Sequence, residues 1–189
     1  MGIVTLEVDL KKLVKAYIFL LLFAGTIIAL DVWTKTIVRG NLGIGEMWSP
    51  WGWLTPYARI VHWYNTGVAF GLFQDANMFF IVLAIIVSSA IILYYSQVPE
   101  EEWPLRIALS MQLAGAVGNL ISRIQVGHVT DFISVGSFPV FNVADSSITV
   151  GVAVLIIGIW LQDRKEKQAE NQPSGIELNE ERPSKETIN

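Results

Sequence analysis

The chain has 189 residues, of which 52% are hydrophobic and only 16% are charged, and its formal net charge is −4. Soluble domains carry about 25% charged residues, so this composition favours a membrane protein. The sequence contains no cysteine, which excludes disulfides, thiolate metal sites and a cysteine nucleophile. Two histidines are too few for most zinc sites, and no strongly basic region argues for a nucleic-acid partner.

Four apolar segments are long enough to cross a bilayer as helices, which requires about 20 residues each. The first follows three lysines and so resembles a signal peptide, but no small-residue cleavage site follows it, and we interpret it as a retained helix. The expected fold is therefore an all-α membrane protein with four transmembrane helices. These helices are expected at residues 13–33, at residues 77–97, between Arg106 and Arg123, and between Asp145 and Asp163.

The basic residues predict the orientation of these helices. Lysines precede the first helix, and Arg164, Lys165 and Lys167 follow the fourth. Because basic residues accumulate on the cytoplasmic side, both termini are expected in the cytoplasm. The acidic loop at residues 97–105 falls on the same side, which is a mild discord, although acidic residues count little in this rule. The connections at residues 36–76 and 123–145 are then expected on the outer side.

The first outer connection is rich in tryptophan and tyrosine, whose rings favour the headgroup region of a bilayer. Residues 58–64 have the composition of a strand, and residues 40–56 contain glycines and prolines typical of turns. We expect a small β-containing domain on the outer membrane surface, between the first two helices. Residues 1–163 would form the membrane domain, and residues 164–189 a flexible, polar cytoplasmic tail.

Asp131 and Asp145 both fall on the expected outer side, where apolar helices are expected to end. An ionisable group at a membrane is costly to keep charged, so it is a functional candidate. Two neighbouring carboxylates share one proton near neutral pH, and the ionised member can take a proton from water while the neutral member polarises a carbonyl. The alternative is that Asp145 only caps the fourth helix and Asp131 only caps a turn.

Other polar residues are candidates for the same region. Asn65 begins a segment of small residues, which could hold an extended peptide or could simply turn the chain before a helix. Asn119 and Arg123 lie one helical turn apart near the outer interface. Arg123 can bind a phosphate or carboxylate, or it can extend to the lipid headgroups.

Two further patterns favour structural roles. Asp31 and Lys35 are four residues apart with the acid first, which is typical of a structural ion pair rather than a catalytic one. Ala114 and Gly118 form a face of small residues that is typical of close helix packing.

Taken in order, five short segments resemble the motifs of the lipoprotein signal peptidases, the signal peptidase II family. The resemblance extends over about residues 12–162, and its strength lies in the order of the motifs on four expected helices. One departure is Ser122, which stands where that family usually has an aspartate before the arginine, so altered support is expected there. The segments that carry the resemblance are residues 31–35, 65–70, 118–123, 129–132 and 141–145.

The resemblance implies an aspartic endopeptidase of the bacterial cytoplasmic membrane. It would remove signal peptides from prolipoproteins by cleaving just before the diacylglyceryl-modified cysteine. Asp131 and Asp145 would activate water, Asp31 and Lys35 would support the bundle, and no metal or cofactor would be required. The implied partners are diacylated prolipoproteins, membrane lipids and inhibitory cyclic peptide antibiotics, with a monomer favoured. Residues implied in substrate binding are Asn65, Gly67, Asn119, Arg123 and Asn142.

Two other functions fit some of these features. A small proton- or ion-coupled transporter could use the same aspartates to relay ions, but it predicts acidic residues deep within helices. A non-catalytic membrane scaffold would need the aspartates only for stability.

Overall fold

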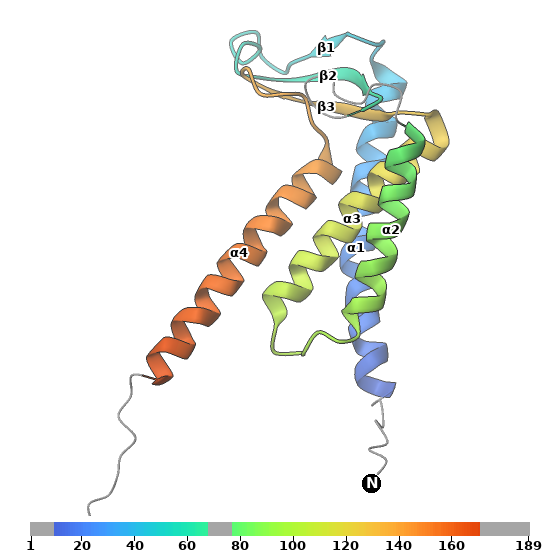
Figure 1. Cartoon of the computed structure of the whole chain (residues 1–189). Coiled ribbons are helices and arrows are strands. Elements are labelled where there is room, and N and C mark those ends of the chain that lie inside the picture. The colour runs from blue at the N-terminus through green and yellow to red at the C-terminus, as the bar shows by residue number, and fades with distance from the viewer. Residues whose placement is uncertain (1–9, 68–76, 171–189) are drawn as a thin grey trace, which may run out of the picture.

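The computed structural model describes residues 10–67 and 77–170. Within these residues, four helices are long and apolar enough to cross a membrane, and a three-stranded sheet lies at one end of them (Figure 1). The expected fold class is confirmed. The elements in chain order are α1 (Leu10–Asn41), β1 (Met47–Trp48), β2 (Ala58–Asn65), α2 (Asn77–Tyr95), α3 (Trp103–Val126), β3 (Val129–Val135) and α4 (Val143–Glu170).

Helix α1 is longer than its apolar segment, and it continues past Trp33 to Asn41. Residues 36–41, which were expected in the first outer connection, are therefore helical. The reason is that this last part of α1 is packed against other elements, because Lys35 and Val38 are both buried. Hydrophobic length alone could not predict that polar residues would extend the helix by two turns.

The sheet has the strand order β1-β2-β3, and both pairs of strands are antiparallel. Strand β2 lies where strand composition predicted it. The third strand comes from the connection between α3 and α4, so the sheet does not lie wholly between the first two helices. Asp131 pairs with Trp63 inside β3 and is not at the end of a helix, which corrects the prediction. Residues 129–135 are rich in β-branched side chains, which favours pairing with β2.

Glycines bring α1, α3 and α4 into close contact at the end of the bundle that carries the sheet, here called the sheet end. A Cβ atom on Gly118 would lie 2.7 Å from Asp31 Oδ2, and one on Gly115 would lie 2.5 Å from the Ala144 carbonyl oxygen. Ala114 instead packs into the apolar core that α3 shares with α1 and α2. The small-residue face therefore serves two contacts, with Ala114 in the core and Gly118 beside Asp31.

The opposite end of the bundle holds the connection between α2 and α3. The Arg106 guanidinium binds this connection by donating to the Val98 carbonyl at 2.7 Å and to the Pro99 carbonyl at 3.0 Å. Helix α4 continues beyond the expected limit at Asp163 to Glu170, since Lys167 pairs with Asp163 at 2.8 Å one turn earlier. The predicted polar tail thus begins as helix, and its residues 171–189 lie outside the described part.

Candidate active site

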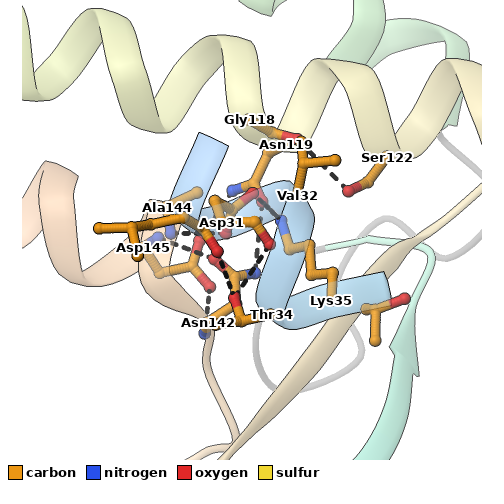
Figure 2. Close-up of polar contacts among 12 residues, drawn as sticks. Asp31, Val32, Thr34, Lys35, Gly118, Asn119, Ser122, Asn142, Ala144 and Asp145 are labelled. Atoms are coloured by element: carbon orange, nitrogen blue, oxygen red, sulfur yellow. Dashed lines mark hydrogen bonds and ion pairs between the residues drawn. The ribbon is translucent and has the colours of Figure 1, made fainter. Parts of the chain in front are cut away.

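Helix α1 contributes a buried ion pair that joins three helices. Lys35 Nζ donates to Asp31 Oδ2 at 2.7 Å, and both side chains are fully buried. Lys35 also donates to Asn119 Oδ1 on α3 at 2.9 Å. The other carboxylate oxygen of Asp31 accepts the Ala144 N–H at 2.9 Å, which satisfies one of the free amides in the first turn of α4. The expected local pair is present, and its outer bonds fix α3 and α4 against α1 (Figure 2).

Arg39 extends the same face of α1 by one more turn, and sequence reasoning missed it. Its guanidinium donates to Thr130 Oγ1 at 3.3 Å, beside Asp131 on β3. The spacing of four residues from Lys35 was a usable signal, because residues four apart share one helix face. Asp31, Lys35 and Arg39 therefore connect α1 to α4, α3 and β3 in turn.

The first turn of α4 is held by a reciprocal cap. The Asp145 N–H donates to Asn142 Oδ1 at 2.9 Å, and the Asn142 N–H donates to Asp145 Oδ2 at 3.2 Å. This arrangement matches a capping box, with Asn142 as the N-cap residue. Asp145 therefore does cap α4, as the alternative interpretation predicted, but it also accepts a hydrogen bond from Asn119. The cap fixes the Asp145 carboxylate, and it leaves the other oxygen available for contacts outside α4.

Asparagine side chains hold both aspartates. Asn142 Nδ2 donates to Asp131 Oδ1 at 2.7 Å, so this one residue binds Asp131 through its side chain and Asp145 through its backbone. Asn65 Nδ2 donates to the other oxygen of Asp131 at 3.1 Å. Asn119 Nδ2 donates to Asp145 Oδ1 at 2.9 Å. Strands β2 and β3 and helices α3 and α4 therefore meet around two carboxylates.

The environment of Asp131 favours its protonated form. Burial raises the pKa of Asp131 most, the negative charge of Asp145 raises it further, and together they bring it to about 6. Hydrogen bonds from Asn65 and Asn142 oppose this shift because they stabilise the carboxylate. A carboxylic acid with this pKa can give or take a proton near neutral pH.

Six of the nine predicted site residues line one cavity of about 640 Å³ at the sheet end. Its wall is completed by apolar residues from the connection between β3 and α4, such as Phe138 and Phe141. The other three, Asp31, Lys35 and Asn142, are fully buried behind the cavity. The six cavity residues are Asn65, Gly67, Asn119, Arg123, Asp131 and Asp145.

Arg123 has a side chain that is only partly satisfied. Its guanidinium lies over the Phe80 ring, 4.8 Å from the centroid, while Nε is buried and has no hydrogen-bond partner within the described residues. Ser122 does not brace it, since the Ser122 hydroxyl donates to the Gly118 carbonyl of its own helix at 3.3 Å. Arg123 therefore lines the cavity while its Nε donor stays buried and without a partner among the described residues.

The segment after Asn65 is described only in part. The Gly67 N–H donates to Asn65 Oδ1 at 3.0 Å, which turns the chain and orients the Asn65 amide toward Asp131. The motif residues 68–70 lie outside the described residues. Within the described residues, no group of three or more His, Cys, Asp or Glu side chains is arranged to hold a metal ion.

Comparisons with known proteins agree on one family. The family model described as signal peptidase (SPase) II matches residues 23–161. The lipoprotein signal peptidase of Desulfitobacterium hafniense is 37% identical over 147 residues, covering 77% of this chain and 95% of the relative. That of Enterococcus faecalis is 34% identical over 153 residues, covering 79% of this chain and 92% of the relative.

A comparison with a solved structure agrees with the sequence comparisons. A bacterial membrane enzyme superposes on this chain with a TM-score of 0.71 at 31% identity, covering 79% of this chain and 91% of the other. The family match includes both aspartates, the whole of α2 and α3, and most of α1 and α4. The chain therefore belongs to the signal peptidase II family.

Proposed function

We propose that this protein is an aspartic endopeptidase that removes the signal peptide from diacylated prolipoproteins, just before the lipid-modified cysteine. Family membership and the names of the relatives supply the substrate class. The observation that carries the catalytic type is the placement of Asp131 and Asp145 on one cavity, both bound by Asn142.

The chemistry follows from one proton shared by two carboxyl groups. The ionised aspartate takes a proton from water as the water oxygen bonds to the scissile carbonyl carbon, and the protonated aspartate donates to the carbonyl oxygen. In the resulting tetrahedral intermediate, the C–N bond breaks as the leaving nitrogen receives a proton from the pair. One hydroxyl of the intermediate returns a proton to the pair as the carbonyl of the new carboxyl group forms. The raised pKa of Asp131 supports this division, and the titration belongs to the pair as a whole.

The remaining site residues have positioning and binding roles in this proposal. Asn65 and Asn119 orient the two carboxylates and so keep them aimed at one water molecule. The guanidinium of Arg123, which lines the cavity, fits a peptide carbonyl or a lipid headgroup oxygen. Asp31 and Lys35 act through the first turn of α4 and through Asn119, and so they support the site without contacting the substrate.

The site's position suits a substrate anchored in the membrane. We infer that both termini face the cytoplasm, because basic residues lie at the ends of α1 and α4 opposite the sheet. The sheet end then lies at the outer face, where the scissile bond can reach the cavity while the lipid stays in the bilayer. A cyclic peptide antibiotic that fills the cavity would inhibit cleavage. The cavity is formed by a single chain, which favours a monomer.

Substitution of each aspartate tests the proposal. Asp131→Asn and Asp145→Asn, purified in detergent with a diacylated prolipoprotein, should each lose cleavage by about 10²- to 10⁴-fold or more, since proton transfer is removed. Asp163→Asn is the matched control, because Asp163 is half-exposed at the other end of α4. Full cleavage by either active-site variant would refute the dyad. Ion flux into proteoliposomes without cleavage would favour the transporter instead.

A further inference from the structure

A second cavity, of about 610 Å³, lies under the sheet beside the end of α1. It shares no lining residue with the cavity that holds the aspartates. Phe132 of β3 forms part of its wall, while the preceding residue, Asp131, faces the other cavity. Successive side chains on a strand point to opposite faces, so β3 separates the two cavities.

The lining of this second cavity, here called the α1 groove, is suited to hydrocarbon. Its wall is apolar apart from Thr34 and Asn41, and no charged residue lines it. The Thr34 hydroxyl donates to the Leu30 carbonyl at 2.7 Å, and the Asn41 amide donates to the Ile37 carbonyl at 2.8 Å. Each of these groups thus makes a hydrogen bond within α1, and the other six lining residues are apolar, so the groove offers an occupant mainly apolar contact.

The α1 groove is continuous with a surface that faces lipid. Leu30, Trp33 and Ile37 are 46%, 62% and 43% exposed on a helix long and apolar enough to span the membrane. Ile37 belongs both to this surface and to the groove. Exposed Trp48 stands at the rim, as rings do near headgroups. From Thr34 to Asn41 the groove follows about 10 Å of α1.

We propose that the α1 groove binds one acyl chain of a membrane phospholipid, from the leaflet next to the sheet. Ile37 joins the groove to the exposed apolar face of α1, so the acyl chain of a neighbouring lipid can reach it. An apolar cavity of this size falls in the range of about 300–1,000 Å³ typical of small-ligand sites. The bound chain packs against Phe132 and supports the strand that carries Asp131. This lipid site goes beyond the proposed peptidase function and does not depend on it.

Photo-crosslinking tests the site in the full chain. The protein is placed in vesicles of phosphatidylethanolamine and phosphatidylglycerol, with some phosphatidylglycerol carrying a diazirine in one acyl chain, and crosslinks are mapped by mass spectrometry. They should occur on the peptides of the sheet that contain Trp48, Ile60 and Phe132, as well as on the helices. Crosslinks confined to the helices would overturn the proposal.

Groove-filling variants sharpen this test. Ile60→Trp should lower crosslinking to β3 about tenfold, because displacing even two methylene groups from apolar contact weakens binding by that factor. Ile157→Trp is the control, since Ile157 is exposed on α4 and does not line the α1 groove. Ile37→Trp, at the half-exposed mouth of the groove, decides the matter if Ile60→Trp does not fold. Unchanged crosslinking in the folded variant would overturn the proposal.

Competition separates the two sources of lipid. Excess diacylated prolipoprotein should leave the sheet crosslinks unchanged, and their loss would assign the groove to the substrate lipid and overturn the phospholipid proposal. Asp131→Asn should crosslink like the unmodified protein. A catalytic failure is therefore distinguishable from a failure of the lipid site.

Discussion

Two acid–base pairs at opposite ends of the molecule have the same local pattern and opposite surroundings. Asp31–Lys35 and Asp163–Lys167 are both spaced four residues apart with the acid first, and their contacts measure 2.7 and 2.8 Å. The first pair is fully buried at the sheet end, whereas the side chains of the second are 53% and 68% exposed. Local spacing therefore predicts that an ion pair forms. Only its burial and its further hydrogen bonds determine how much it contributes to stability.

The buried pair has a role that the exposed pair lacks. Removing two charges from water is costly, and their attraction repays that cost only when further hydrogen bonds complete both groups. Asp31 and Lys35 meet this condition through the Ala144 N–H and Asn119 Oδ1. These bonds hold the two helices that carry Asn119 and Asp145. The pair thus stabilises the arrangement of the site in addition to α1 itself.

The largest effect should come from breaking the buried pair. Lys35→Met leaves the Asp31 charge buried without its partner, which should lower the free energy of unfolding by about 3–5 kcal/mol. Lys167→Met, the matched change in the exposed pair, should lower it by about 0–1 kcal/mol. Unfolding in detergent measures both. Equal losses in the two variants would contradict the comparison, and Asp31→Asn combined with Lys35→Met should recover part of the loss.

A smaller effect should follow from crowding the buried pair without removing it. Gly118→Ala places a Cβ atom 2.7 Å from Asp31 Oδ2, and overpacking of this kind costs about 1–3 kcal/mol. Gly25→Ala on α1 is the control, because a Cβ atom there has nothing within 4 Å. Thermal unfolding and prolipoprotein cleavage should both decline in the first variant only. A Gly118→Ala protein as stable as Gly25→Ala would show that Asp31 can move freely.

The smallest effect concerns the pH dependence of cleavage by the site at the sheet end. The pKa of Asp131 is raised to about 6, so the pair loses its shared proton as the pH rises through that value, and kcat/KM should fall there. Asn65→Ala removes a hydrogen bond that lowers this pKa, so the fall should move to higher pH, by about one unit.

A pH series of initial cleavage rates measures this shift. Asp163→Asn should lower neither the rate nor the pH at which it falls, since Asp163 lies at the exposed end. If the rate of Asn65→Ala falls at the same pH as that of the unmodified protein, Asp131 is not the group whose deprotonation causes the fall.

Much of this protein could be predicted from the sequence because the signals are local. Apolar length predicted four helices, strand composition predicted β2, and the spacing of Asp31 and Lys35 predicted their pair. The short motifs also predicted which residues gather at the site, and six of them do line one cavity. Each of these signals lies within one continuous segment of the chain.

Only the tertiary structure decided the rest, because it depends on residues far apart in the sequence. Asp131 lies in a strand because β2 pairs with it, and α1 extends to Asn41 because Lys35 and Val38 find buried partners. The bond from Asp31 to the Ala144 N–H needs the space left by Gly118. No local pattern encodes these contacts. The sequence by itself determined which carboxylates and amides are present, and packing determined which of them are buried together.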